Sequence, residues 1–172
     1  MAASIFRLAP EHEVDNFDCG DADLNTYLRR YARKNQAKYS VGVTYVCVDP
    51  PVSMTVLGYY TLANSSVSKS DLPQLTKSIP YPQVPAVLLA RLGVHRSVQG
   101  KSIGSLLLRD ALRRTLSLKE SSGCRLVLVD AYASAVEWYL KYGFVAIEGN
   151  AEGSRTRRMF MDVLTIERAT AE

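Results

Sequence analysis

The feature that most constrains this chain is a junction between two kinds of regular structure near its middle. Residues 87–94 have the apolar character of a buried strand, and residues 103–116 repeat leucine and other apolar residues at helical spacing. Between them lies the turn Gln99-Gly100-Lys101-Ser102-Ile103-Gly104. A glycine-bearing turn that restarts as a helix leaves backbone N–H groups without internal partners at the positive end of the helix dipole. The junction therefore predicts an anion site, typically one for phosphate.

The rest of the chain alternates strand-like and helix-like segments. We expect strands at 4–8, 41–48, 56–62, 87–94, 125–130, 144–147 and 158–166. We expect helices at 24–38, from 103 to an exit at Gly123, and at 133–142. A polar connector over 65–85 separates the two halves, with at most a short helix around 71–77. This order predicts an α/β (α+β) fold with a mixed central β-sheet and helices on both faces. A chain of 172 residues, 47% hydrophobic and 22% charged, suits a single domain over residues 1–172.

Several classes of protein are disfavoured by what the sequence lacks. Cys19, Cys47 and Cys124 are far apart and odd in number, so we expect no disulfide framework. The N-terminus lacks the pattern of a signal peptide, and no apolar stretch approaches a membrane span, which predicts a cytoplasmic protein without membrane contact. His12 and His95 are isolated, so we expect no metal.

Residues 24–38 combine helical apolar spacing with a run of cations. Leu24, Tyr27, Leu28 and Tyr31 fall at i, i+3, i+4 and i+7, which predicts an amphipathic helix that Asp21 or Asp23 caps. The segment has no acid, and its cations are Arg29, Arg30, Arg33, Lys34 and Lys38. A basic outer face of this kind is either simply solvated or binds a polyanion such as nucleic acid.

Two nucleotide-binding patterns come close to the turn at 99–104, and both fail. The P-loop pattern G-x-x-x-x-G-K-S would need glycine at position 95, where this chain has His95. The dinucleotide pattern G-x-G-x-x-G would need glycine at position 102, where it has Ser102. The expected anion is therefore not held by either of these two loops.

The turn follows a different signature in register. Gln99, Ser102 and Gly104 resemble the Q/R-x-x-G-x-G/A signature of the GNAT superfamily of N-acetyltransferases, in which glycine is usual where this chain has Ser102. Ala135, Tyr139 and Gly143-Phe144 resemble the closing A-x-x-x-Y-x-x-x-G-F pattern of the same family. A serine at 102 would cost roughly 1–2 kcal/mol if its φ is positive, and little if its backbone is helical.

The resemblance implies the GNAT fold, with a central strand that splays from its neighbour, and acetyl-CoA as cosubstrate. It implies that the Val94 N–H polarises the thioester and that Tyr139 protonates the coenzyme A sulfur, with Tyr142 as the nearby alternative. A tyrosine that only packs its helix is the other interpretation of Tyr139. The implied cofactor-binding residues are Leu92, Gly93, Val94, Gln99, Gly100, Lys101, Ser102, Ile103 and Gly104.

A narrower resemblance covers nearly the whole chain. The stretches Phe17-Asp18-Cys19-Gly20, Leu24-Asn25 and Leu89-Ala90-Arg91-Leu92 resemble the acetyltransferase toxins of bacterial toxin–antitoxin modules. This implies acetylation of the α-amine of aminoacyl-tRNA, which blocks translation, a ribbon-helix-helix antitoxin as partner, and a homodimer. The residues expected to bind tRNA are Arg29, Arg30, Arg33, Lys34, Lys38 and Arg91. Arg91 could instead form a structural ion pair.

No acid lies on the strand 87–94, where many lysine or polyamine acetyltransferases place a glutamate base. At pH 7.5 an amine of pKa about 10.4 is roughly 0.1% neutral, whereas an α-amine near 7.7 is about 40% neutral. The missing base therefore favours an α-amino substrate, although Glu137 or Asp130 could act through water. The alternatives are an acetyltransferase for a protein N-terminus or small amine, and a non-catalytic acyl-CoA-binding module.

Overall fold

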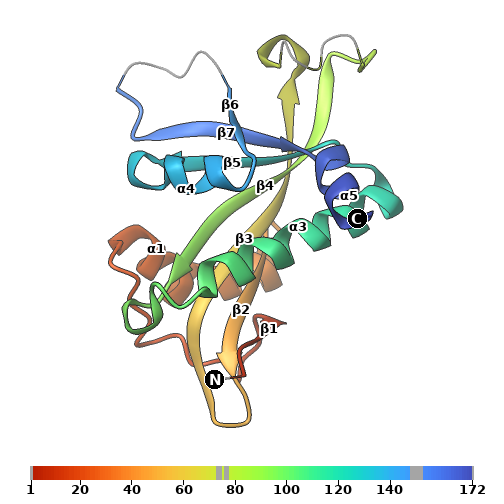
Figure 1. The fold of residues 1–172 in the computed structure, drawn as a ribbon. Helices are drawn as coiled ribbons and strands as arrows, with labels where there is room; N and C mark the ends of the chain where they lie inside the picture. Colours follow the sequence, from red (N-terminus) through yellow and green to blue (C-terminus); the bar gives the residue numbers. More distant parts are fainter. Residues whose placement is uncertain (1, 73–74, 76–77, 148–152, 172) are drawn as a thin grey trace. The chain divides into compact units, whose positions relative to one another are not determined.

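The computed structural model describes residues 2–72, 75, 78–147 and 153–171. They fall into two compact units, Met1–Ala63 with Ala90–Ala111, and Asn64–Leu89 with Leu112–Glu172. The described strands form one sheet in the order β1-β2-β3-β4-β5-β7-β6, which confirms the predicted mixed α/β class (Figure 1). Three elements contribute to both units: β3 (Ser53–Ser68), β4 (Gln83–Val94) and α3 (Ile103–Ser122).

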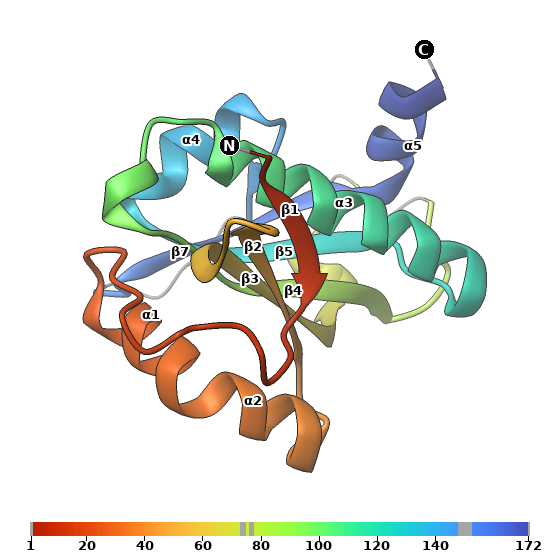
Figure 2. The same ribbon diagram turned by 90° about the horizontal axis from the view of Figure 1, so that it is seen from below.

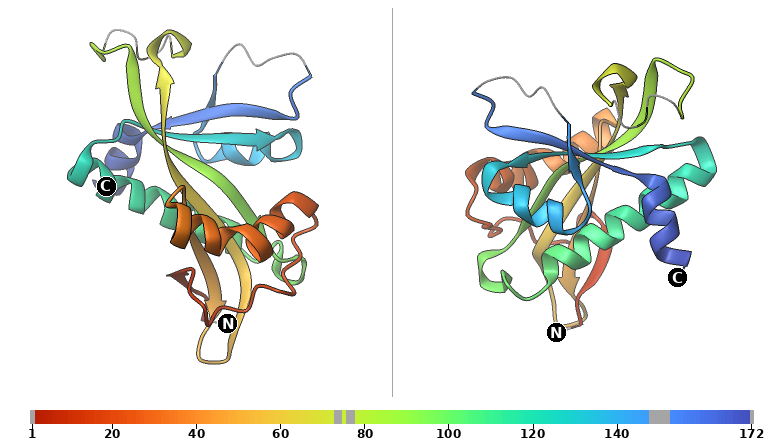
Figure 3. Two further views of the ribbon diagram at one scale, coloured as in Figure 1. Left: turned by 180° about the vertical axis from the view of Figure 1, so that it is seen from behind. Right: turned by 45° about the horizontal axis from the view of Figure 1, so that its top comes forward.

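The first unit is built on an antiparallel meander. Strand β1 (Ser4–Arg7) pairs antiparallel with β2 (Val43–Asp49), and β2 pairs antiparallel with β3. Side chains on a strand alternate between the two faces of the sheet. On β3, the Tyr59 hydroxyl donates to the carbonyl of Leu24 at 2.8 Å, while the next residue, Tyr60, donates to the Asp110 carboxylate on α3 at 2.5 Å. Helices therefore cover both faces within this unit (Figure 1; Figure 3, left).

The predicted basic helix is a helical run over residues 22–39, which we call the cationic helix (Figure 2). The Asp21 side chain caps it by accepting from the Leu24 N–H at 2.9 Å, as predicted. Two stretches are wound as π-helix, so that the Ala32 N–H bonds to the Tyr27 carbonyl five residues earlier. The run consists of α1 (Ala22–Thr26), η1 (Tyr27–Tyr31), α2 (Ala32–Lys34) and η2 (Asn35–Tyr39).

The winding changes which residues face inward. In an α-helix residue i+4 shares the face of residue i, but in a π-helix residue i+5 takes that place. Ala32 is accordingly buried beside Tyr27 and Leu28, whereas Tyr31 is 51% exposed. The prediction that Tyr31 lies on the apolar side of this helix is wrong.

The second unit holds the remaining strands and helices. Strand β4 runs parallel to β5, with Ala86 opposite Leu126 and Leu89 opposite Val129. Strand β5 pairs antiparallel with β7, and α4 covers these strands on one face (Figure 3, right). The elements are β5 (Leu126–Tyr132), η6 (Ala133–Ala135), α4 (Val136–Lys141), β6 (Val145–Ala146), β7 (Thr156–Asp162) and α5 (Val163–Ala171). The predicted splay of the central strand from its neighbour involves residues that belong to different units, so it stays a prediction. The single domain over residues 1–172 also stays a prediction.

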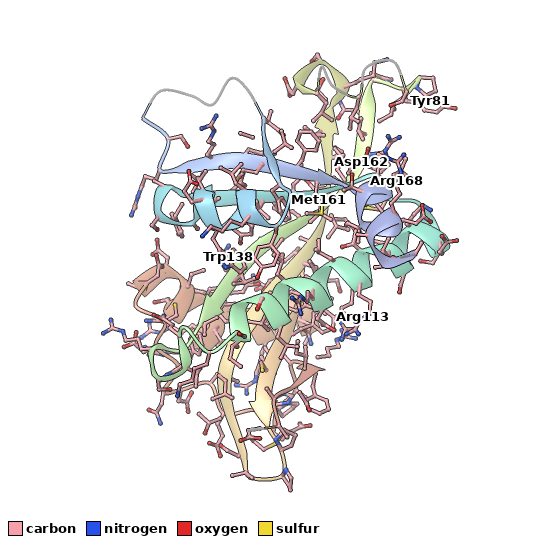
Figure 4. All side chains as sticks on the ribbon, in the orientation of Figure 1. Tyr81, Arg113, Trp138, Met161, Asp162 and Arg168 are labelled. Carbon is pink, nitrogen blue, oxygen red and sulfur yellow. The ribbon has the colours of Figure 1, made fainter. Side chains whose placement is uncertain are left out.

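Several predicted strand boundaries are wrong. Strand β3 continues to Ser68, and strand β4 begins at Gln83. The connector between them is therefore shorter than expected, and it holds the 3-10 turn η3 (Lys69–Asp71). The expected helix around 71–77 falls partly on residues 73–74 and 76–77, outside the described residues. The last strand ends at Asp162 rather than at residue 166, because the Asp162 carboxylate accepts from the Leu164 N–H at 3.0 Å and caps α5 (Figure 4).

None of the helices in the described part of the chain combines the length and the apolar character that a membrane span requires.

Candidate active site

The anion site predicted at residues 99–104 lies within residues 95–104, which we call the phosphate turn. After β4 ends, η5 (Arg96–Val98) makes one tight turn, and α3 begins at Ile103. The first helical hydrogen bond joins the Leu106 N–H to the Ser102 carbonyl at 3.1 Å. The N–H groups of Ile103, Gly104 and Ser105 precede that bond, so they are the donors that a helix N-terminus offers to an anion.

Two residues of the phosphate turn adopt left-handed backbone conformations. Gly100 has φ +76° and Ser102 has φ +66°. A Cβ added at Gly100 would meet no atom within 4 Å, so glycine is favoured there by its backbone angle and not by crowding. Of the two backbone conformations considered for Ser102, the structure has the strained one, because its φ is positive. The GNAT signature usually has glycine at this position.

Close packing against β3 fixes the start of α3. A Cβ on Gly58 would lie 2.9 Å from Leu107 Cδ1, 3.1 Å from Ile103 Cγ2 and 3.1 Å from the Gly93 carbonyl oxygen. The absence of a side chain at Gly58 therefore lets β4 and the first turn of α3 approach the same point of β3. This approach positions the helix N-terminus next to the end of β4.

Val94, whose N–H is predicted to polarise the thioester, is the last residue of β4. The His95 N–H donates to the Leu57 carbonyl of β3 at 2.8 Å. Because successive peptide groups on a strand point to opposite sides, the Val94 N–H points away from β3. The Val94 carbonyl lies on that same side and accepts from Gln99 Nε2 at 2.9 Å.

The predicted cofactor residues have different surroundings. Gln99 Nε2 also donates to the Cys19 carbonyl at 3.0 Å, so this amide ties the turn both to the end of β4 and to Cys19. The Lys101 side chain is exposed, and its N–H bonds to the Val98 carbonyl at 3.3 Å. Leu92 is half-buried, Ile103 is buried, and Gly93 packs against Cys19 and Tyr59.

Arg91 is held by an aromatic ring. Its guanidinium carbon lies 4.2 Å from the centroid of the Tyr27 ring, and Tyr27 stacks on Tyr59 with 6.3 Å between centroids. No carboxylate of the described residues lies within ion-pair distance of Arg91, so the structural ion pair considered for it is not present among them. The stacked guanidinium keeps donors for an anion.

The cations of the cationic helix divide into two groups. Arg29 donates to the Phe17 carbonyl, and Arg33 donates to the His12 carbonyl and, at 3.5 Å, to that of Ala9. These two guanidinium groups therefore hold the loop that precedes the helix. Arg29 is nevertheless exposed, and of the five cations only the half-buried Arg33 departs from the expected basic outer face.

The other three cations, Arg30, Lys34 and Lys38, are exposed. The ammonium groups of Lys34 and Lys38 lie 5.6 and 5.5 Å from the Tyr39 ring centroid, and Tyr39 is itself 49% exposed. Exposed cations interleaved with exposed tyrosines are typical of a surface that binds nucleic acid.

The predicted acid, Tyr139, lies in the second unit. Its side chain is 7% exposed and packs edge-on against Trp138 and Phe144, at 5.0 and 5.3 Å between centroids (Figure 4 labels Trp138). Burial raises the pKa of Tyr139 to about 12, because the charged phenolate is poorly solvated there. Its hydroxyl has no hydrogen-bond partner among residues 2–72, 75, 78–147 and 153–171, and its role as the acid stays a prediction.

The two residues considered as bases that act through water, Asp130 and Glu137, differ in whether their carboxylates are already paired. Asp130 is engaged by Arg158, whose Nε and Nη2 donate to the two carboxylate oxygens at 2.8 and 3.0 Å. Arg158 and its neighbour Arg157 lie on β7. Glu137 is exposed on α4. In the described part of the chain, no three His, Cys, Asp or Glu side chains gather as a metal site would require.

Sequence reasoning missed the residues that brace the phosphate turn from outside. Asp18 accepts from Arg96 in an ion pair of 3.2 Å, and Asn25 bonds both Asp18 and Cys19. Their signal was the stretch from Phe17 to Asn25, which carried the resemblance to the toxins but was assigned no function.

Comparisons with known proteins agree with this geometry. Residues 56–146 match the acetyltransferase (GNAT) domain family. A protein of Mycobacterium tuberculosis named tRNA-acetylating toxin is 36% identical over 140 residues, which cover 80% of this chain and 81% of that protein.

Three solved structures that contain the toxin AtaT are similar over 98% or more of both chains. One, AtaT complexed with acetyl-methionyl-tRNAfMet, has a TM-score of 0.87 at 28% identity and covers 98% of this chain and 99% of that one. AtaTR bound with AcCoA has a TM-score of 0.82 at 28% identity and covers 98% of each chain. A mutant AtaT bound to the C-terminus of the antitoxin AtaR has 0.82 at 25% identity and covers 100% of each.

The family match spans the strand, the phosphate turn and the segment of Tyr139, where the resemblance was first noted. This chain therefore belongs to the GNAT family of acetyltransferases.

Proposed function

We propose that this chain is an acetyl-CoA-dependent N-acetyltransferase toxin that acetylates the α-amino group of aminoacyl-tRNA and so blocks translation. The observation that carries the proposal is that one compact unit contains both the phosphate turn and the exposed cations of the cationic helix. The tRNA-acetylating relative and the AtaT structures support the same substrate class.

Acetyl-CoA fits the phosphate turn by its chemistry. The pyrophosphate is an anion that the N–H groups of residues 103–105 and the exposed Lys101 favour. The end of β4 offers the Val94 N–H on the side away from β3, where the thioester carbonyl needs a donor. AtaTR has been solved with AcCoA, which supports this assignment. The reaction as proposed uses no metal.

In the proposed reaction the neutral α-amine attacks the thioester carbonyl carbon, and the N–C bond forms. The Val94 N–H stabilises the negative charge that develops on the carbonyl oxygen. The C–S bond then breaks, the thiolate takes a proton from Tyr139, the nitrogen loses its extra proton to solvent, and Tyr139 regains a proton from solvent. With a pKa near 12, Tyr139 stays protonated throughout the physiological range.

The acceptor explains the missing base on β4. An α-amine is about 40% neutral near pH 7.5, and the ester of an aminoacyl-tRNA lowers the amine pKa further by withdrawing charge, so its deprotonation needs little help. Arg30, Lys34 and Lys38, with the exposed Tyr31 and Tyr39, form the proposed tRNA surface on the cationic helix. Arg91, stacked on Tyr27, is the proposed phosphate contact closest in sequence to Val94.

The proposed partner is a ribbon-helix-helix antitoxin, and the complex of AtaT with the C-terminus of AtaR supports an antitoxin of some kind. A substrate of this class implies action in the cytoplasm. The homodimer expected from the resemblance stays a proposal.

The experiment that tests the proposed function is acetyl transfer from labelled acetyl-CoA to a panel of aminoacyl-tRNAs, followed by mass analysis of the released amino acids. We expect N-acetyl-aminoacyl-tRNA with the wild-type protein and a large loss of turnover in Tyr139→Phe. Transfer to peptides or small amines without transfer to tRNA would favour the alternative acceptors. Coenzyme A binding without turnover on any amine would make the chain a binding module.

A further inference from the structure

A short segment lies between the cationic helix and the phosphate turn and is bonded to both. This segment, residues 17–20, is called the strap here. On its helix side, Asn25 Nδ2 donates to Asp18 Oδ1 at 3.0 Å, and Asn25 Oδ1 accepts from the Cys19 N–H at 2.8 Å. Arg29 donates to the Phe17 carbonyl. The strap is thus fixed to the helix through side chains at two positions.

On its other side the strap is bonded to the phosphate turn. The Arg96 N–H donates to the Asp18 carbonyl at 2.9 Å, and Arg96 Nε lies 3.2 Å from Asp18 Oδ2. Gln99 Nε2 donates to the Cys19 carbonyl at 3.0 Å. Three contacts therefore hold the turn from outside, in addition to the bonds that it makes within itself.

The strap is also packed against the strands. Phe17 is buried and meets Tyr59 and His95 edge-on, at 5.4 and 5.9 Å between centroids. Cys19 Sγ lies 3.4 Å from the place where a Cβ on Gly93 would stand. The strap cannot shift away from the turn without losing this packing.

Asp18 joins the two sides of the strap through one carboxylate. Its Oδ1 accepts from Asn25 and from the Gly20 N–H at 2.9 Å, and its Oδ2 faces Arg96. The Gly20 and Asn25 hydrogen bonds, with the nearby arginines, lower the pKa of Asp18, so the carboxylate is ionised at neutral pH. A charged acceptor makes stronger hydrogen bonds than a neutral one.

We infer that Asp18 and Asn25 are positioning residues for acetyl-CoA: through the strap they hold the phosphate turn in the geometry that receives the pyrophosphate. The inference rests on the proposed function only for the identity of the ligand. A general role in folding would affect every property of the protein. A positioning role affects the recognition of the pyrophosphate and spares the reacting end of the donor.

The test compares two donors that differ at the pyrophosphate. Acetyl-CoA carries it, and S-acetylpantetheine carries the same thioester without it. The variants are Asn25→Ala and Asp18→Asn, and the matched controls are Asn16→Ala and Asp15→Asn, since both control residues are exposed and precede the strap. Calorimetry with coenzyme A measures affinity without any acceptor, and thermal unfolding reports on the fold.

We expect the two strap variants to weaken coenzyme A binding and to raise KM for acetyl-CoA about tenfold, as expected for the loss of one or two hydrogen bonds to a charged group. KM for S-acetylpantetheine and kcat with saturating acetyl-CoA should change less than about twofold. The two controls should match the wild type with both donors.

Equal losses with both donors, or losses as large in the controls, would overturn the inference and leave Asp18 and Asn25 as ordinary structural residues. If Asn25→Ala does not fold, Arg96→Gln breaks the same connection from the turn and carries the same expectation. A wild type that binds coenzyme A but acetylates no tRNA refutes the proposed acceptor, and the calorimetric comparison still decides the inference. A wild type that does not bind coenzyme A refutes both.

Discussion

Ser102 has a backbone conformation that residues with a side chain disfavour, and replacing it tests how the phosphate turn is built. Its φ is +66°. A Cβ in the left-handed region costs roughly 1–2 kcal/mol, and glycine removes that cost. Glycine in turn loses about 0.5–1 kcal/mol more conformational entropy on folding. Ser102→Gly should therefore raise the free energy of unfolding by the difference, about 0.5–1 kcal/mol.

Thermal unfolding measures this effect. A gain of that size in a chain of this length corresponds to a rise in Tm of about 1–4 °C. Gly100→Ala is the matched opposite change, because Gly100 has φ +76° and open space where a Cβ would stand. It should lower the free energy of unfolding by about the same amount, since only the backbone angle penalises the new methyl group.

Ser102→Ala separates the backbone effect from the hydroxyl group. Alanine keeps the Cβ and its strain, so we expect no gain in Tm from this variant. A Ser102→Gly protein that melts at or below the wild-type temperature, while Gly100→Ala is destabilised, would refute the assignment of strain to Ser102. An equal gain from glycine and alanine would place the unfavourable interaction in the hydroxyl group instead.

Three further outcomes are expected. Gly58→Ala should lower the free energy of unfolding in urea by about 1–3 kcal/mol, because its Cβ would lie 2.9 Å from Leu107 Cδ1 and 3.1 Å from the Gly93 carbonyl; no change would mean that the start of α3 yields freely. Tyr139 has a folded pKa of about 12, above its unfolded value near 10, so its neutral form contributes stability that is complete below pH 10 and is lost as pH rises to 12. The difference in unfolding free energy between wild type and Tyr139→Phe should fall by about 3 kcal/mol over that interval, and a constant difference would contradict the buried phenol. Arg30→Ala, Lys34→Ala and Lys38→Ala combined should reduce the slope of log affinity for tRNA against log salt by about 2 to 3 while KM for acetyl-CoA is unchanged; an unaltered slope would mean that this surface is merely solvated.

The sequence was sufficient where a structural signal is local. The apolar spacing after residue 102, the cap at Asp21 and the glycine at 143 each act within one turn of chain, and the structure has α3, α1 and the end of α4 there. The last strand shows the limit. Val163 and Ile166 favour a strand by their β-branched side chains, but the Asp162 cap converts the chain to helix after residue 162.

The site, like the fold, could be predicted from the sequence only where its residues are close together along the chain. The phosphate turn follows from consecutive residues, so residues 99–104 could be identified before the fold was known. The strap could not be identified, because its bonds join residues that are distant in sequence, such as Cys19 with Gln99. The strain at Ser102 was stated as one of two alternatives, and the choice between them needed the backbone angle.

The winding of the cationic helix decides which cations are free to meet a polyanion. In a regular α-helix the direction of each of the five cations follows from its place in the 3.6-residue repeat. The π-helical stretches break this repeat, and Arg33 faces the loop carbonyls of Ala9 and His12. A guanidinium that moved from those carbonyls to a phosphate would leave the carbonyls without their charged donor, which costs about 1.5–3 kcal/mol. An exposed cation such as Lys34 meets a phosphate without that loss. The polyanion should therefore lie on the outer face of the helix, while Arg29 and Arg33 hold the loop that leads into the strap.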